Sequence, residues 1–195
     1  NESILSYLIH EGLLSEETYA VFHPSVANRL DRNTSGIVLA GKTLAGQQFL
    51  SDILRDRSAK KIYHCIVRGK VEEEMHLKGY LLKDERSNQV QIFSDETQDA
   101  KPIETAYRPL VVGPDATLLE VHLITGRSHQ IRAHLASIGH PIAGDPKYGD
   151  MVWNKQLRQD FSVRSQLLHA YSITLPDGRT FIADEPEIFS QIMRG

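Results

Sequence analysis

Short apolar runs, each bounded by a glycine or a turn, place the strongest constraint on how this 195-residue chain folds. In residues 118–125, apolar side chains alternate with polar ones, which predicts a strand with one buried face. Compact runs over 36–40 and 61–68 predict two more strands, and weaker signals lie at 90–93 and 105–112. A sheet therefore forms the centre of the predicted fold.

Three segments show helical spacing instead. Residues 3–12 carry apolar side chains at helical intervals, with Gly12 as a stop signal. Thr43 is expected to cap a helix that runs to about residue 57, and Ser128 to open a helix that ends at Gly139. Clustered strands with few interspersed helices indicate an α+β fold rather than a regular βαβ alternation.

The composition is that of one ordinary globular domain, with 41% hydrophobic and 24% charged residues. No uninterrupted apolar run approaches the roughly 18 residues that span a bilayer, and the N-terminus carries no secretion signal. The single cysteine, Cys65, excludes an internal disulfide and a cysteine-rich zinc site within the chain. We therefore expect a soluble monomer in a reducing, cytoplasmic compartment.

The net charge of −3 argues against bulk positive charge as the means of holding nucleic acid, but the charges are unevenly distributed. Residues 24–68 hold eight Lys or Arg against three Asp, whereas residues 72–99 hold three against eight Asp or Glu. Residues 1–23 hold four Glu and no Lys or Arg. The basic segment is either an anion-binding face or a solvated surface with chance blocks of charge, and the distribution alone leaves both open.

The segment 28–36 places Asp31 between Arg29 and Arg32, directly before a predicted strand. Nearby positive charge favours the ionised form of a carboxyl group, and the small residues that follow permit a tight backbone approach. These properties suit a reactive carboxylate. The alternative is a turn in which Asp31 makes a surface ion pair, which is the better interpretation of a generic Asp–Arg pair.

The segment 60–67 forms a predicted strand that carries Tyr63, Cys65 and Val67 on one face. Tyr63 then stands at the edge of a pocket, where its ring is available for stacking. Core packing is the usual alternative for a tyrosine in a strand. Cys65 has no obvious base near it in the sequence, so we interpret it as a small buried filler rather than a nucleophile.

The segment 125–134 places Arg127 and Arg132 near the start of a predicted helix, where guanidinium groups suit a phosphate or an internal carboxylate. An ordinary helix with two exposed arginines is the alternative. The histidines here suggest a metal site, but His129 and His134 are five residues apart, roughly 140° around a helix. A zinc-binding helix places its histidines four apart on one face, so we predict no metal ligands.

Together these segments resemble the RluA-type family of pseudouridine synthases, which includes enzymes of large-subunit ribosomal RNA. The matching motifs occur in the family's order over roughly residues 24–175. They are Arg29-Leu30-Asp31-Arg32 with Thr34-Ser35-Gly36; Lys61-Ile62-Tyr63 with Val67 and Gly69; Thr125-Gly126-Arg127-Ser128-His129-Gln130-Ile131-Arg132 with His134; Gly139-His140-Pro141-Ile142 with Gly144-Asp145; and Leu167-Leu168-His169-Ala170. Chance agreement of five ordered segments is remote.

The resemblance implies a central mixed, mainly antiparallel sheet with flanking helices. It implies an enzyme that isomerises specific uridines in structured RNA to pseudouridine, with no cofactor and no metal. Asp31 is then the catalytic carboxylate, Tyr63 packs on the target base and assists proton removal, and Arg132 pairs with Asp31. A carboxylate nucleophile must stay ionised, which Arg132 would enforce.

The resemblance also implies how RNA is held. Arg29 corresponds to the residue that fills the gap left when the uridine flips out of its stack, a movement that costs a few kcal/mol. Arg127 and Leu168 are expected to contact the substrate as well. The expected partner is RNA, with large-subunit ribosomal RNA favoured over transfer RNA, and no membrane.

The sequence departs from the family pattern at two places. Asn28 stands where many members have His, and the family's upstream strand with an Asn-Lys-Pro segment is absent, as is an S4-type domain. We expect residues 1–195 to form a single catalytic domain without these parts. Alternatives are a transfer RNA pseudouridine synthase, an RNA-binding module without catalysis and a metal-dependent hydrolase. Asp31, Tyr63 and Arg132 together favour an enzyme, because binding alone needs no carboxylate facing an anionic ligand.

Overall fold

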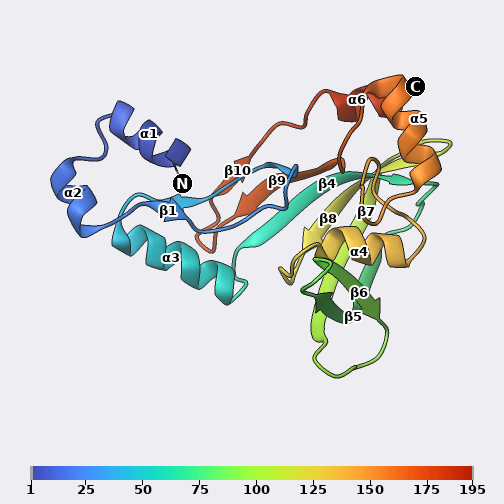
Figure 1. The fold of residues 1–195 in the computed structure, drawn as a ribbon, viewed down its shortest axis with the longest axis horizontal. Coiled ribbons are helices and arrows are strands. Elements are labelled where there is room, and N and C mark those ends of the chain that lie inside the picture. Colours follow the sequence, from blue (N-terminus) through green and yellow to red (C-terminus); the bar gives the residue numbers. More distant parts are fainter. Residues whose placement is uncertain (1, 195) are drawn as a thin grey trace.

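The computed structural model describes residues 2–194, apart from the side chains of residues 2, 3 and 16, and an eight-stranded sheet forms its centre (Figure 1). The strands are β2 (Ser35–Gly36), β4 (Lys60–Arg68), β5 (Met75–Asp84), β6 (Gln89–Phe93), β7 (Lys101–Val112), β8 (Ala116–Leu123), β9 (Leu168–Thr174) and β10 (Thr180–Ile182). Their order is β10-β9-β4-β8-β7-β5-β6 with antiparallel neighbours, and β2 joins β9 in parallel. The predicted α+β fold with a mixed, mainly antiparallel sheet is confirmed.

The helices of the described chain lie on both faces of this sheet and to one side of it. They are α1 (Glu2–His10), α2 (Glu16–Val21), α3 (Leu44–Arg55), α4 (Gln130–Ser137), α5 (Met151–Phe161) and α6 (Ile188–Arg194). On one face, Leu135 of α4 belongs to a buried cluster with Cys65 of β4, and on the other, Phe189 of α6 clusters with Ile66 of β4. No helix among residues 2–194 has the length and apolarity needed to cross a membrane.

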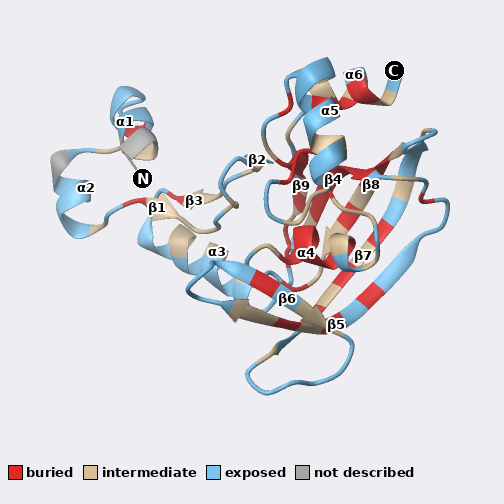
Figure 2. Cartoon of the chain, turned by 45° about the vertical axis from the view of Figure 1, so that its right-hand side comes forward, coloured by how far each residue is buried: buried red, intermediate tan, exposed pale blue. Residues whose placement is uncertain are grey.

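The N-terminal elements lie to one side of the main sheet (Figures 1 and 2). Here β1 (Ser25–Val26) pairs with β3 (Ala40–Gly41), and α3 packs through Ile53 against Ile173 of β9. Thr43 caps α3 as predicted, because its side chain accepts the N–H of Gly46 at 3.1 Å. Figure 2 shows that the buried residues concentrate instead in β4, β8, β9 and α4. The buried core of the molecule is therefore centred on these three strands and α4 (Figure 2).

The predicted strand over 36–40 is wrong, since only its two ends pair with other strands. The side chain of Asn28 occupies the place of a neighbouring strand. Its amide nitrogen donates to the carbonyl of Ile37 at 3.2 Å, and its oxygen accepts the N–H of Leu39 at 2.7 Å. These backbone groups are thereby satisfied without a sheet ladder. The residue that departs from the family pattern thus fixes the chain just after Asp31.

Other differences lie at element ends and in segments of weak pattern. The helix expected to open at Ser128 begins at Gln130, with His129 in the left-handed region (φ 54°) and no side-chain cap. Helices α2, α5 and α6 and strands β5, β9 and β10 were not predicted. Two runs of three polar or charged residues lie within α5, on either side of Leu157, its one buried residue. Trp153, Leu157 and Phe161 are spaced four apart and pack in one cluster, a helical pattern that the sequence analysis missed.

A glycine in this region gives a direct test of the packing between β2 and β9. Gly36 has φ +108°, and a Cβ there would lie 2.3 Å from the backbone oxygen of Ala170. Gly36→Ala should therefore lower the free energy of unfolding by about 3 kcal/mol or more, from strain and overpacking together. Gly178→Ala is the matched control, because Gly178 has φ +87° but no atom within 4 Å of the added Cβ.

In the control variant the free energy of unfolding should fall only by the cost of holding alanine in this backbone conformation, about 1–2 kcal/mol. Urea unfolding of both variants measures the difference. Equal losses would show that the β2–β9 approach is not tight.

Candidate active site

The side chain of Arg132, on α4, lies between two carboxylates and is only 5% exposed. Its Nη1 donates to Asp31 Oδ2 at 3.1 Å, and its Nε and Nη2 donate to the two oxygens of Asp145 at 2.7 and 2.9 Å. Burial lowers the pKa of Arg132, but the hydrogen bonds and charges of Asp145 and Asp31 outweigh it and hold that pKa above its ordinary value. The guanidinium is thus a permanent cation that joins three segments of the chain.

Asp145 has no exposed side-chain surface and is held by the backbone as well as by Arg132. Its Oδ1 accepts the N–H groups of Lys147 at 2.8 Å and Tyr148 at 3.1 Å. Burial raises the pKa of Asp145, but the hydrogen bonds from Arg132 and these N–H groups outweigh it, so the pKa lies below its ordinary value. Asp145 is therefore a fully engaged carboxylate with no oxygen left for chemistry.

Asp31 is placed differently. Its side chain is 23% exposed, and within the described part of the chain Oδ1 has no hydrogen-bond partner. The loop that carries Asp31 is fastened from β9 and the residues just before it. Gln166 Nε2 donates to the carbonyl oxygen of Arg32 at 2.7 Å, and Ser35 Oγ lies 2.8 Å from His169 Nδ1. Asp31 is thus held in place through one oxygen, while the other has no hydrogen bond among the described residues.

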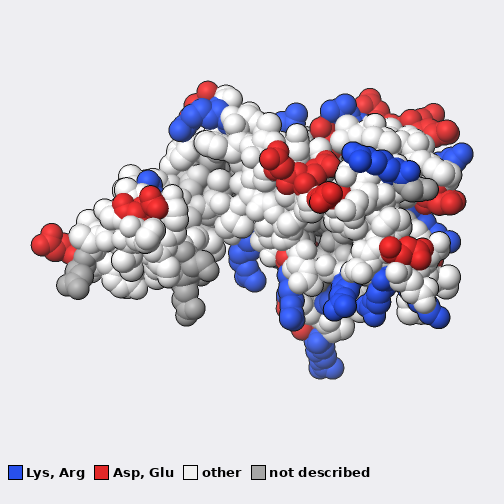
Figure 3. Space-filling model, turned by 90° about the horizontal axis from the view of Figure 1, so that it is seen from above, with Lys and Arg blue, Asp and Glu red and all other residues white. Residues whose placement is uncertain are grey.

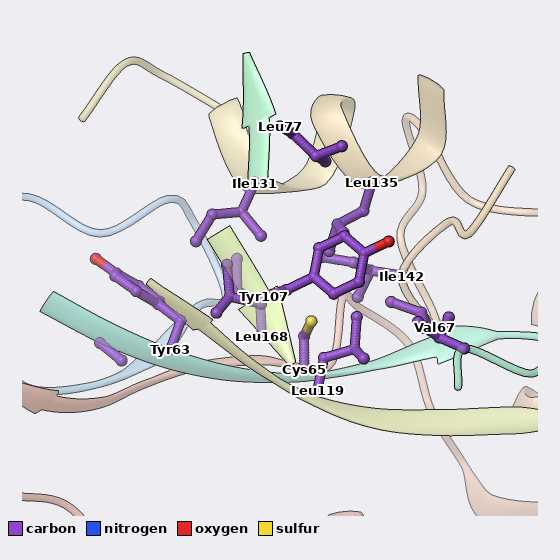
Figure 4. Close-up of a cluster of buried hydrophobic side chains, with 13 residues drawn as sticks. Tyr63, Cys65, Val67, Leu77, Tyr107, Leu119, Ile131, Leu135, Ile142 and Leu168 are labelled. Carbon is purple, nitrogen blue, oxygen red and sulfur yellow. The ribbon is translucent and has the colours of Figure 1, made fainter. Parts of the chain in front are cut away.

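Tyr63 stands at one end of the buried cluster (Figure 4). Figure 4 shows its ring at the margin of the cluster, with the hydroxyl group pointing away from Cys65 and Leu119. Burial and the negative charge of Asp31 raise the pKa of Tyr63 to about 12. The side chain is therefore a protonated phenol at neutral pH, close enough to Asp31 to sense its charge.

The start of α4 is shaped by the side chain of Gln130, which is 2% exposed. Its Oε1 accepts hydrogen bonds from Thr125 Oγ1 at 2.7 Å and from the N–H of Arg127 at 3.1 Å. Its Nε2 donates to Thr105 Oγ1 on β7 at 2.9 Å. This side chain replaces the expected serine cap and fixes α4, and with it Arg132, relative to the sheet.

Tyr148 closes the other side of Arg132. Its ring centre lies 5.3 Å from the guanidinium carbon, which is within the range of a cation–π contact. Its hydroxyl oxygen accepts the N–H of Val90 on β6 at 2.9 Å and lies 2.9 Å from His129 Nδ1. Burial is the largest influence on the pKa of His129, which it lowers. The neutral imidazole of His129 and the ring of Tyr148 thus lie together on this side of the Arg132 guanidinium.

The structure brings Asp31, Tyr63 and Arg132 together, as the sequence analysis expected of a site. Leu168 lies in the same buried cluster as Tyr63 and is 5% exposed. Arg29 and Arg127 are exposed, and neither side chain forms an ion pair within residues 2–194. Their guanidinium groups are consequently available to a partner.

The histidines that suggested a metal site do not converge. His129 lies against Tyr148, and His140 Nδ1 lies 3.0 Å from the carbonyl oxygen of Arg68. Burial lowers the pKa of His134 to about 4, and its Nδ1 lies 3.1 Å from Thr105 Oγ1. Among the described residues, no group of three His, Cys, Asp or Glu side chains is arranged to hold a metal ion.

Sequence reasoning missed the roles of Asp145, Gln130 and Tyr148. Asp145 stood in a matched motif, but its partner is thirteen positions back along the chain, on a helix. Only Asp145 carried a local signal, because it is a carboxylate between Gly144 and Pro146, and such a group is buried only when its hydrogen bonds are satisfied. That signal does not identify the partner that satisfies those hydrogen bonds.

Comparisons with known proteins agree with this geometry. The family model described as RNA pseudouridylate synthase matches residues 8–137 of this chain. The ribosomal large subunit pseudouridine synthase C of Haemophilus ducreyi is 37% identical over 177 residues, which cover 90% of this chain and 54% of that protein. The tRNA pseudouridine synthase C of Vibrio cholerae is 36% identical over 159 residues, which cover 76% of this chain and 65% of that protein.

A solved structure, that of human RNA pseudouridylate synthase domain containing 4, has the same fold. It matches with a TM-score of 0.72 at 21% identity and covers 95% of this chain and 82% of that one. The chain spans between 54% and 65% of the length of the two curated relatives above. On the family match and these identities, the chain belongs to the RNA pseudouridylate synthase family.

The buried charge cluster gives a test of stability. Asp145→Asn removes the main partner of a buried guanidinium, so the free energy of unfolding at pH 7 should fall by about 3 kcal/mol. Because the pKa of Asp145 is lowered by folding, its contribution is present above the unfolded value of about 4 and is lost as the pH falls below it. The gap between wild type and variant should therefore narrow from pH 5 to pH 3.

Urea titrations at several pH values measure this gap. The matched control is Asp177→Asn, which removes a carboxylate paired with Arg179 on the surface and should change stability little. A variant at position 145 that is as stable as wild type at pH 7 would contradict the assigned role.

Proposed function

We propose that this chain converts specific uridines in structured RNA to pseudouridine, with Asp31 as the catalytic carboxylate. The observation that carries the proposal is the half-buried carboxylate of Asp31, paired with Arg132 at 3.1 Å beside Tyr63. The fixed guanidinium keeps such a carboxylate ionised, as a nucleophile requires. A module that only bound RNA would gain nothing from a negative charge facing a phosphate backbone. Membership of the family supports the same activity.

The chemistry is an isomerisation that needs no oxidant, reductant or second substrate. The N1–C1′ bond of uridine breaks and a C5–C1′ bond forms, while C5 loses a proton and N1 gains one. The free oxygen of Asp31 supplies the nucleophile and is released again when the product forms. Arg132 remains bonded to the other oxygen throughout, so the carboxylate does not need to reorient between steps.

Tyr63 contributes its ring first and its hydroxyl later. The ring forms the floor on which the target base packs, at the margin of the buried cluster. With a pKa of about 12 the phenol is poorly suited to take up a proton while Asp31 carries its charge. Bonding of Asp31 to the substrate removes that charge, and with it one of the two causes of the raised pKa. We place the role of Tyr63 in proton removal after this step.

For the substrate we propose large-subunit ribosomal RNA. The Haemophilus relative, which matches 90% of this chain, bears that name, whereas the Vibrio relative is named for transfer RNA. We further propose that the chain acts as a monomer in the cytoplasm. Mapping pseudouridines in both classes of RNA, from cells with and without this protein, distinguishes the two substrates. Loss of a site from ribosomal RNA supports the proposal, and loss from transfer RNA alone refutes it.

Substitution of the carboxylate tests the catalytic role directly. Asp31→Asn keeps the size of the side chain but removes the negative charge, so pseudouridine formation should be abolished while RNA affinity stays nearly unchanged. Asp31→Glu should also be severely impaired, because the added methylene displaces the reacting oxygen. Tritium release from RNA that contains 5-tritiated uridine is the assay. Asp160→Asn, an exposed carboxylate on α5, is the control that should retain full turnover.

A second substitution tests the proposed role of Arg29 in replacing the flipped base. Arg29→Ala should lower turnover on structured RNA more than on an unpaired strand, because less stacking must be broken in the latter. Arg32→Ala is the matched control, an exposed cation on the same loop, and should lower turnover on both substrates to the same degree. Equal losses for Arg29→Ala would show that this side chain is only another phosphate contact.

A further inference from the structure

A hollow lies outside the Asp31 site, bounded by the turn after α3 and by strands β5 and β7. Its volume is about 370 Å³, within the range of roughly 300–1,000 Å³ that is usual for small-molecule sites. The lining residues come from separate parts of the sequence. They include Arg57, Lys78, Gly79, Tyr80, Glu104 and Thr125.

The lining combines an aromatic side chain with cations. Lys78 and Tyr80 share the open face of β5, because Leu77, Gly79 and Leu81 between and beside them are buried on the other. Arg57 reaches the hollow from the turn, where it is exposed. An aromatic face beside basic groups is the combination that single-stranded nucleic acid binds, the base on the ring and the phosphate on the cations.

The one acidic residue in the lining is already engaged. Glu104 Oε1 lies 2.7 Å from His76 Nε2 and 3.7 Å from Lys78 Nζ. Arg57 forms no ion pair within residues 2–194, and Lys78 shares its partner with His76. The lining therefore carries positive charge that the chain does not fully neutralise.

Positive charge continues from the hollow onto β4. Burial first and the charge of Arg57 second lower the pKa of Lys61, and Lys60, Lys61 and His76 contribute to the lowered pKa of His122 after burial. Like charges held together raise the energy of the free protein, and a bound anion would relieve it. In Figure 3, Lys and Arg side chains gather along the lower rim of the larger part of the molecule.

The hollow is connected to the Asp31 site through Thr125. The hydroxyl of Thr125 donates to Gln130 Oε1 at 2.7 Å and accepts the N–H of Glu104 at 2.9 Å. Gln130 lies two positions before Arg132 on α4. One residue thus borders the hollow and also fixes the helix that carries the buried guanidinium.

We propose that this hollow binds one nucleotide of the RNA strand outside the target uridine, with its base against Tyr80 and its phosphate between Arg57 and Lys78. The inference rests on the proposed function in taking RNA as the ligand. It adds a second point of contact, away from Asp31, that would set the path of the strand.

Binding of mononucleotides tests this site without any turnover. The four nucleoside 5′-monophosphates, inorganic phosphate and uridine are each titrated into the ¹⁵N-labelled chain. The nucleotides should shift the amide signals of Gly79 and Thr125 and leave that of Gly178, in the β9–β10 turn, unmoved. Inorganic phosphate and uridine should each bind at least about fivefold more weakly than the nucleotides.

Variants show which side chain contacts the base and which contacts the phosphate. Tyr80→Leu should weaken nucleotide binding at least about fivefold, and Tyr80→Phe should bind as wild type because it retains the ring. Arg57→Ala should weaken the binding of nucleotides. It should also reduce the slope of log affinity for RNA against log salt concentration by about one, because nearly one counterion fewer is released on binding. Arg158→Ala, an exposed cation on α5, is the matched control and should change neither. A dispersed spectrum of each variant verifies that it is folded.

The outcomes separate this inference from the proposed function. Nucleotide shifts at Gly79 that disappear in Tyr80→Leu support the site, whether or not the wild-type chain forms pseudouridine. Normal pseudouridine formation with no shift at Gly79 overturns the site alone. Equal shifts from phosphate and nucleotides also overturn it, because they would mark an anion site that does not recognise a base.

Discussion

The buried charge of Arg132 is the constraint on which the site depends. A guanidinium that cannot lose its proton and is only 5% exposed must find its counter-charge inside the protein. It does so by drawing together Asp145, thirteen positions ahead, and Asp31, 101 positions behind. The loop before β2, helix α4 and the turn after Asp145 cannot move independently without stranding a charge. Ion pairs therefore hold these three segments together as much as side-chain packing does.

The two carboxylates have different roles because Arg132 binds them differently. Asp145 takes two donors of the guanidinium fork and two backbone N–H groups, which occupies both its oxygens in a fully buried position. Asp31 takes only the remaining nitrogen and stays 23% exposed. One carboxylate thus neutralises the cation, and the other is oriented by it. This division leaves one oxygen of Asp31 without a hydrogen bond among the described residues, and it leaves no buried charge unpaired.

Strands β4, β7 and β8 could be predicted from the sequence because they are decided by local pattern, whereas β9 and β5, which flank them in the sheet, were missed. Leu119 and Val121 are fully buried, whereas Glu120 and His122 are not, as the alternation required. The pairing of Arg132 with Asp31 was implied by resemblance to a family, since no periodicity connects residues a hundred positions apart. The strand over 36–40 was predicted wrongly because a side chain, that of Asn28, replaced a strand as hydrogen-bonding partner.

The turn after Asp145 also connects the site to the β5–β6 hairpin. Tyr148 receives the N–H of Val90 at its hydroxyl, and Lys147 Nζ donates to the carbonyl of Asn88 at 2.6 Å. The same two residues give their own N–H groups to Asp145. A displacement of the hairpin would therefore pull on the carboxylate that neutralises Arg132. Since β5 also supplies Lys78 and Tyr80 to the proposed nucleotide-binding hollow, an RNA strand held there would contact the hairpin to which the Arg132–Asp145 charge cluster is hydrogen-bonded.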